Sequence, residues 1–146
     1  MRIIVDGDGC SGRESIEKVA KEYSIPLYLY CDINHSITLN YGEVIVCDSH
    51  FQSVDMVIFN KTLKNDIVVT QDYGVAAMVL SKGAYAISPT GFIYEEDNID
   101  RLLFERHIKS KVRRGGGKIK GPRKRNKEDD DRLYNTLRDI ITKGLQ

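Results

Sequence analysis

Aspartates stand where the predicted strands of a parallel sheet would end. Asp6 and Asp8 follow the apolar run Ile3–Val5, and Asp72 comes two residues after the run Ile67–Thr70. Ligands of an open parallel sheet bind in the crevice beyond the carboxyl ends of its strands, so these side chains are expected to share one cleft. Two like charges about 4 Å apart repel by roughly 4 kcal/mol at an effective dielectric near 20. A divalent cation, Mg²⁺ or Mn²⁺, is the simplest way to relieve that repulsion.

Three more aspartates occupy plausible cleft positions. Asp55 lies near the start of a predicted helix over residues 52–63 and is expected to join Asp6, Asp8 and Asp72 as a metal ligand. Asp48 and Asp97 follow other predicted strands and are additional candidate ligands. Asp6, Asp8 and Asp72 are also the predicted catalytic residues. The competing interpretation is structural, because aspartates at strand ends and helix caps accept backbone N–H bonds without any metal.

The pattern of apolar residues predicts an α/β fold. Five runs are continuously apolar, as expected for strands covered on both faces, and helical periodicity fills the gaps between them. Ser11 and Glu14 have the spacing of a capping box and predict the start of the first helix. The alternation from residue 2 to residue 88 indicates a three-layer, doubly wound, mostly parallel five-stranded sheet. The predicted strands are residues 2–5, 27–31, 44–47, 66–70 and 84–88.

Charge is segregated along the chain. Residues 106–127 contain 11 Lys and Arg and no Asp or Glu, whereas residues 1–105 contain 16 acidic and 8 basic residues. Glycines at 115–117 and 121 interrupt any helix, so residues 106–127 are predicted to be a flexible basic arm. Residues 128–143 follow as an amphipathic helix that docks back on the body.

A glycine-hinged basic arm suits phosphate backbones, because each neutralised phosphate releases counterions. RNA or another single-stranded nucleic acid is the predicted partner, held by charge and not by base stacking, because the arm contains no aromatic residue. The alternative is a solvated loop whose charges balance the acidic body. The predicted nucleic-acid-binding residues are Arg113, Arg114, Lys118, Lys120, Arg123, Lys124 and Arg125.

Cysteine usage and hydropathy point to the cytoplasm. Cys10, Cys31 and Cys47 have neither C-x-x-C spacing nor histidines at zinc-like intervals. The N-terminus reaches an acidic residue after three apolar ones, too early for a signal peptide, and no apolar stretch approaches the roughly 20 residues of a membrane span. A cytoplasmic protein without membrane association is expected.

Two other enzyme or signalling folds share parts of this pattern. A haloacid-dehalogenase-like phosphatase also begins with a strand and D-x-D, but Cys10 stands where its motif usually has Thr. A response-regulator receiver has acids after its first strand, an Asp after its third and a hydroxyl residue after its fourth, which Asp48 and Thr70 imitate. Its fifth strand should end in Lys-Pro, and here Ser88-Pro89 stands there.

Several short motifs in order resemble the YaiI/YqxD family over nearly the whole chain. They are Val5-Asp6-Gly-Asp8-Gly-Cys10, Val46-Cys47-Asp48 with Phe51 and Asp55, Asp66-Ile-Val-Val-Thr70-Gln-Asp72, Pro89-Thr-Gly91 with Asn98-Ile99-Asp100, Arg106, and Gly121-Pro122. The family's usual D-A-D-A-C-P pattern is altered here, since glycines replace both alanines and Ser11 replaces the proline. The substituted Gly7 and Gly9 are expected to loosen the turn that holds Asp8.

By resemblance the family is grouped with PIN-like domains, whose ribonucleases use acidic residues at corresponding places. The resemblance therefore implies a single PIN-like domain over residues 1–146 and assigns the metal-binding roles to Asp6 with Asp8, Asp55, Asp72 and Asp97. The leading hypothesis is a metal-dependent phosphodiesterase or ribonuclease. The alternatives are a nucleic-acid-binding or regulatory protein that does not cleave, and a phosphatase acting on a small phosphoester.

Overall fold

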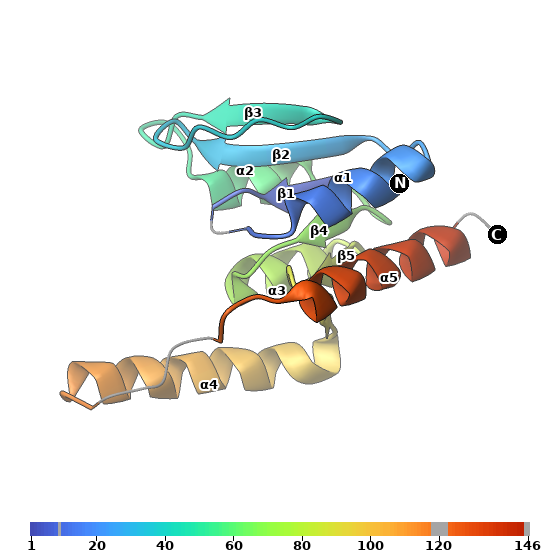
Figure 1. Ribbon diagram of the computed structural model, residues 1–146. Coiled ribbons are helices and arrows are strands. Elements are labelled where there is room, and N and C mark those ends of the chain that lie inside the picture. The colour runs from blue at the N-terminus through green and yellow to red at the C-terminus, as the bar shows by residue number, and fades with distance from the viewer. Residues whose placement is uncertain (9, 118–122, 145–146) are drawn as a thin grey trace.

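A six-stranded, mostly parallel sheet forms the centre of the computed structural model, which describes residues 1–8, 10–117 and 123–144 (Figure 1). The strand order is β3-β2-β1-β4-β5-β6, and only β6 runs antiparallel to its neighbour. The order differs from the 2-1-3-4-5 arrangement of receiver domains, so the receiver interpretation is wrong. The strands are β1 (Ile3–Asp6), β2 (Leu27–Asp32), β3 (Glu43–Cys47), β4 (Ile67–Val69), β5 (Tyr85–Ile87) and β6 (Ile93–Tyr94).

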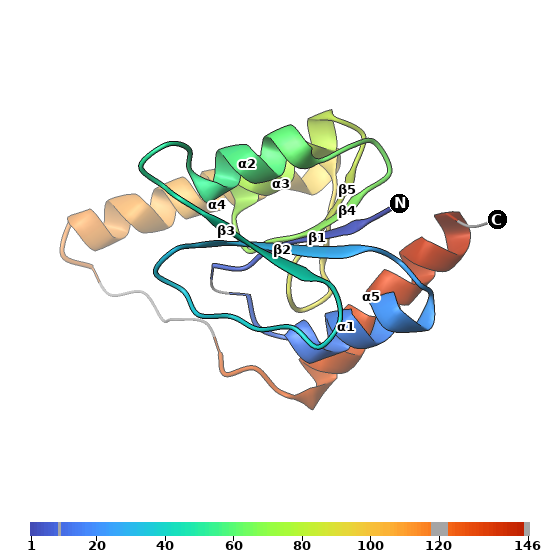
Figure 2. The ribbon, with the colours of Figure 1, turned by 90° about the horizontal axis from the view of Figure 1, so that it is seen from above.

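Helices cover both faces of the sheet, which confirms the predicted three-layer α/β fold with a C-terminal helix. Figure 2 shows α1 and α5 on one face and α2, α3 and α4 on the other. The helices are α1 (Arg13–Glu22), α2 (Val54–Lys61), α3 (Tyr73–Ser81), α4 (Glu96–Arg114) and α5 (Lys127–Gly144).

The strands are buried on both sides, which explains their continuous apolar runs. In β1, Ile3 and Val5 pack into the core beneath α1 and α5, whereas Ile4 packs into the core beneath α2 and α3. Leu133 and Leu137 of α5 are fully buried in the first of these cores. The apolar stripe predicted for the last helix therefore docks it on the body.

Two local features differ from the predictions. The sheet has a sixth strand, β6, whose two residues are too short for a periodic signal. It follows a turn at Gly91, where φ is 86° and an added Cβ would lie 2.7 Å from the Arg132 backbone. The capping box predicted for α1 is wrong, because Gly12 occupies the N-cap position without a side-chain cap. A capping box instead opens α4, between Glu95 and Asn98.

The predicted flexible arm begins as helix. Residues 106–114 continue α4 without interruption, because lysine and arginine are good helix formers and their charges complement the C-terminal end of the helix dipole. The first helix-breaking residue is Gly115, which ends α4. Residues 118–122 lie outside the described part of the chain.

Among the described residues, no helix is both long enough and apolar enough to cross a membrane.

Candidate functional site

An open cleft lies at the carboxyl edge of the sheet, where β1 and β4 are neighbours. This is the point at which the strand order reverses, the position where open α/β sheets bind ligands. The cleft has a volume of about 870 Å³. Four of the six aspartates singled out from the sequence line it: Asp6, Asp8, Asp55 and Asp72.

Hydrogen bonds connect the ends of β1 and β4. The Thr70 hydroxyl donates to Asp6 Oδ2 at 3.0 Å and accepts from the Asp72 backbone N–H, also at 3.0 Å. Asp72 Oδ1 then caps α3, accepting from the N–H groups of Gly74 at 2.8 Å and Val75 at 3.3 Å. Thr70 is fully buried and is therefore a positioning residue for both carboxylates.

Burial and the repulsion between neighbouring carboxylates disfavour the fully ionised state of this acidic wall. Burial raises the pKa of Asp6 to about 6, against the lowering effect of the Thr70 hydroxyl, and the Asp55 carboxylate adds to the rise. The pKa of Asp55 is also raised, by burial and then by the charges of Asp72 and Asp8. A positively charged group bound in the cleft would favour the ionised forms of Asp6 and Asp55.

Asp8 lies at the open side of the cleft, with its side chain 40% exposed. Its Oδ1 is 2.9 Å from Nδ1 of His35, in the loop after β2. Gly7, which precedes Asp8 in the sequence, is buried, and a Cβ atom added to it would lie 2.5 Å from Leu29 Cδ2. The Gly7 N–H also donates to Tyr30 O at 2.8 Å, so Gly7 itself is closely packed, while the expected loosening of the turn stays a prediction. Gly9 lies outside the described residues.

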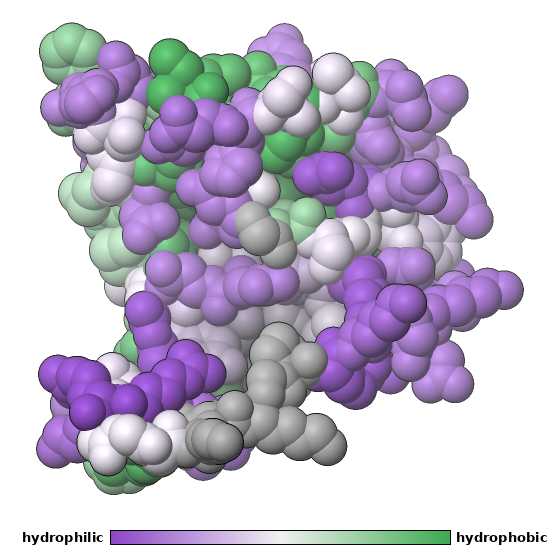
Figure 3. All heavy atoms as spheres, turned by 60° about the vertical axis from the view of Figure 1, so that its left-hand side comes forward, coloured by the Kyte–Doolittle hydropathy of each residue, from purple (hydrophilic) through white to green (hydrophobic). Residues whose placement is uncertain are grey.

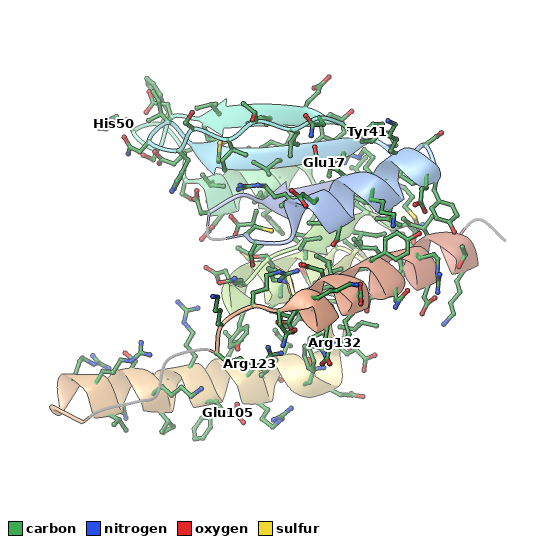
Figure 4. The ribbon with its side chains drawn as sticks, in the orientation of Figure 1. Glu17, Tyr41, His50, Glu105, Arg123 and Arg132 are labelled. Carbon is green, nitrogen blue, oxygen red and sulfur yellow. The ribbon has the colours of Figure 1, made fainter. Side chains whose placement is uncertain are left out.

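The remaining two aspartates are not in the cleft. Asp48 accepts the His50 N–H at 3.0 Å and organises the loop after β3, where Figure 4 shows His50 at the edge of the molecule. Asp97 lies in the first turn of α4, where its charge favours the helix dipole. Both positions match the structural interpretation of a strand-end or helix-start aspartate.

The opposite wall of the cleft is basic and comes from α4. Its basic residues are Arg106, Lys109, Arg113 and Arg114, with Glu105 as the one acidic residue that α4 contributes to the described lining. Their spacing of three, seven and eight residues from Arg106 places them on one helix face. Arg106 Nη1 lies 3.5 Å from Asp72 Oδ1, which joins the two walls at their base. Figure 3 shows strongly hydrophilic side chains over this part of the surface, which is hollowed beneath the body.

Arg106 and Lys109 were not among the predicted site residues, because residues 106–127 were interpreted as an arm without regular structure. The signal was present as the helical spacing of the four basic residues. Gln71 and Tyr73 also line the cleft, and both flank Asp72 in the sequence.

Two of the predicted nucleic-acid-binding residues are instead held in ion pairs at the start of α5. Arg123 binds Asp129 through both terminal nitrogens, at 2.6 and 2.9 Å, and Arg132 contacts the same carboxylate (Figure 4). These bonds lower the pKa of Asp129 to about 2, with Arg123 the main cause. Arg125 binds Asp130 at 2.7 Å and the Pro89 carbonyl at 2.7 Å.

The other members of that predicted set fall into three groups. Arg113 and Arg114 line the cleft from α4. Lys124 is exposed beside the ion-paired arginines. Lys118 and Lys120 lie outside the described residues. Binding by Arg113 and Arg114 stays a prediction, whereas Arg123 and Arg125 have a structural task.

The chemistry of the cleft suits a hard divalent cation, because its acidic wall presents only oxygen ligands. Within residues 1–8, 10–117 and 123–144, however, no three His, Cys, Asp or Glu side chains converge closely enough to hold a metal ion by themselves. Mg²⁺ is commonly held by one or two carboxylates together with water and substrate phosphates. The residues fit that open mode and not a closed protein cage.

Thr70→Val is expected to raise the pKa of Asp6 above about 6, because the substitution removes the hydrogen bond that favours the charged carboxylate. Carbon-13 NMR titration of the aspartate carboxyl groups measures the change. Thr70→Ser, which keeps a hydroxyl, should leave the value near that of the parent. Equal titration curves for the parent and the Val variant would show that Thr70 does not control Asp6.

The chain is similar to several known proteins over nearly its whole length. The chain is 64% identical over 143 residues to a UPF0178 protein of Clostridium perfringens (strain SM101 / Type A), covering 98% of this chain and 96% of that protein. It is 61% identical over 146 residues to a UPF0178 protein of Clostridium novyi (strain NT), covering 100% of this chain and 98% of the relative. A third UPF0178 protein, from Clostridium acetobutylicum, is 48% identical over 146 residues and 99% of each chain.

No solved structure matches the chain. Residues 4–143 match the profile of the family described as "Uncharacterized BCR, YaiI/YqxD family". That match includes both walls of the cleft and most of α5. The chain therefore belongs to the YaiI/YqxD family.

Proposed function

We propose that this protein hydrolyses phosphodiester bonds in single-stranded nucleic acid, preferably RNA, with the help of Mg²⁺ or Mn²⁺. The observation that carries the proposal is the two-sided cleft, in which a wall of carboxylates from β1, α2 and the β4–α3 turn faces a wall of Lys and Arg from α4. A phosphodiester backbone needs both: cations to hold its phosphates, and carboxylates to hold the metal that acts on one of them.

Each wall has its own task in this proposal. Arg106, Lys109 and Arg113 bind consecutive phosphates along α4 and orient the strand across the cleft. The Tyr73 ring, also in the cleft, offers a face for one base. A bound divalent ion would lower the pKa of a coordinated water and stabilise the leaving oxygen.

The acidic residues would hold that ion without a rigid cage. Asp6 is fixed by Thr70, and Asp72 is fixed by its cap on α3, so their carboxylates are preorganised at the end of β1 and after β4. Asp55 and Asp8 approach from α2 and from the turn after β1 and assist. Burial raises the pKa of Asp6 and of Asp55, and neighbouring carboxylates add to the rise, so a bound divalent ion would favour the charged form of both groups.

A protein that binds nucleic acid without cleaving it is the second candidate. It is favoured by the observation that no three potential ligands in the described residues converge to hold a metal on their own. A substrate panel separates the candidates: labelled single-stranded RNA, single-stranded DNA and p-nitrophenyl phosphate, each with Mn²⁺, Mg²⁺ or chelator. Cleavage of RNA that needs the metal supports the proposal, binding without cleavage supports the second candidate, and hydrolysis of only the small ester indicates a phosphatase.

Asp72→Asn is expected to abolish cleavage while the fold survives, because asparagine caps a helix about as well as aspartate but carries no charge for a metal. The same variant should lose the rise in melting temperature that Mn²⁺ gives the parent, since an ion that binds only the folded state stabilises it. Asp97→Asn, outside the cleft, is the matched control. An undiminished metal-dependent rise in the Asp72→Asn variant would place the metal elsewhere.

A further inference from the structure

Arg106 contacts both walls of the cleft. It lines the basic wall with Lys109 and Arg113, yet its Nη1 lies 3.5 Å from Oδ1 of Asp72 on the acidic wall. Burial and the neighbouring carboxylates raise the pKa of Asp55, and the Arg106 charge opposes that rise, so the guanidinium acts on Asp55 as well. Among the described residues, no other Lys or Arg forms an ion pair with a cleft aspartate. The acidic wall is therefore partly neutralised by a side chain from the opposite wall.

The contact between Arg106 and Asp72 is easily broken. At 3.5 Å it is longer than a hydrogen bond between a charged nitrogen donor and a carboxylate, which is about 2.7–2.9 Å. The Arg106 side chain is 60% exposed and that of Asp72 is 35% exposed, so water screens the attraction. Asp72 Oδ1 also accepts the N–H groups of Gly74 and Val75, so α3 keeps its cap without Arg106. Loss of this ion pair therefore costs the fold little.

We propose that Arg106 exchanges Asp72 for a phosphate when the divalent ion binds, so that the ion and the nucleic-acid strand bind cooperatively. This inference rests on the proposed function, because it concerns the same ion and the same strand. A divalent ion beside the cleft aspartates competes with Arg106 for Asp72 and repels its charge. The released guanidinium already lies in the basic wall, where it binds a phosphate through two parallel N–H···O bonds.

The coupling between ion and strand is reciprocal. A strand that binds Arg106 removes the competitor of the ion, so it raises the affinity for the ion by the factor by which the ion raises the affinity for the strand. The exchange needs only the rotation of one side chain, because Arg106 lies on the same helix face as Lys109 and Arg113. The strand is then held most tightly when the metal that acts on it is in place.

Binding of Mn²⁺ alone tests the first half of the exchange, with free Mn²⁺ measured by electron paramagnetic resonance. Arg106→Gln should tighten Mn²⁺ binding by about two- to fivefold, the range that corresponds to the loss of an exposed ion pair. Lys109→Gln is the matched control and should tighten it less, because Lys109 lies on the same wall but pairs with no carboxylate in the described part of the chain. Both side chains are exposed, so both variants should fold.

The Mn²⁺ measurement separates this proposal from the proposed function. If the parent binds Mn²⁺ and the two variants bind it with equal affinity, the exchange is overturned while the proposed function stands. If none of the three proteins binds Mn²⁺, both are overturned.

Binding of single-stranded RNA tests the second half, by fluorescence anisotropy with chelator or with Ca²⁺, which binds oxygen ligands as Mg²⁺ does. With chelator, Arg106 remains paired with Asp72, so Arg106→Gln should weaken RNA binding by less than about twofold. With Ca²⁺ the loss should be about two- to fivefold greater, the factor that reciprocity requires. Lys109→Gln should weaken binding by the same factor in both conditions. A loss for Arg106→Gln that does not depend on the ion overturns the exchange.

Discussion

Asp6→Asn should make the metal-free protein more stable at pH 8 while it abolishes hydrolysis. The pKa of Asp6 is about 6 in the folded chain and 3.8 in the reference state, so the folded state holds the proton more tightly. The stabilising contribution of Asp6 is therefore fully present below about pH 3.8 and is lost as the pH rises through about 6. At pH 8 the ionised carboxylate costs up to about 3 kcal/mol, from 1.36 kcal/mol per pKa unit, and asparagine removes this cost.

Urea unfolding of the parent and the variant at pH 4 and at pH 8 measures this effect. The difference in unfolding free energy between the two proteins should move in favour of the variant by about 2–3 kcal/mol over that range. The difference in unfolding free energy at any single pH also includes the loss of the long hydrogen bond from the Asp8 N–H to Asp6, at 3.4 Å, because an asparagine retains only one acceptor oxygen. Asp48→Asn, which removes one carboxylate outside the cleft, is the control for the change in charge. Parallel profiles for the parent and the Asp6 variant would show that Asp6 has an ordinary pKa.

Removal of the basic wall should weaken binding of single-stranded RNA by at least about tenfold near 0.1 M salt. The variant combines Arg106→Gln, Lys109→Gln, Arg113→Gln and Arg114→Gln. Each phosphate contact that is lost should flatten the slope of log K against log salt by about 0.7, giving a total change of up to about 3. Fluorescence anisotropy at several salt concentrations measures both quantities.

A variant with four neutralised lysines elsewhere serves as the matched control, because it changes net charge by the same amount. It combines Lys18→Gln, Lys21→Gln, Lys61→Gln and Lys64→Gln, all at exposed positions of α1, α2 and the loop after α2. If both variants bind RNA more weakly than the parent and by the same factor, the loss of affinity comes from net charge alone and α4 is not the binding wall. If neither differs from the parent, the cleft does not bind RNA.

The acidic wall was predictable because it depends on strand ends. Continuous apolar runs locate β1 and β4, and the rule that parallel strands end at one edge places Asp6 and Asp72 together on the basis of sequence alone. The same rule does not locate side chains on loops: Asp48 also follows a strand, yet it turns to its own loop and lies outside the cleft. Position in the sequence shows which edge a residue reaches, but not which way its side chain points.

The basic wall was harder to predict because charge composition does not distinguish a helix from a flexible arm. The run from Arg106 to Arg114 forms helix, since nothing in it breaks one before Gly115. The ion pair of Arg123 was not predicted, although its partner, Asp129, lies only six residues further along the chain. A local search for opposite charges would have found this pair.

The Tyr94 hydroxyl donates to the Thr70 carbonyl at 3.2 Å, and α4 starts two residues after Tyr94. This hydrogen bond connects the end of β4, which precedes Asp72, to the segment from which α4 starts. With 19 residues and a rise of about 1.5 Å each, α4 is a lever about 28 Å long. A tilt of about 10° at its base displaces its far end by about 5 Å, while Arg106, nearer the base, moves roughly half as far. A change in this angle would therefore widen or narrow the cleft most between the body and Arg113 and Arg114, while Asp6 and Asp72 keep the positions that Thr70 gives them.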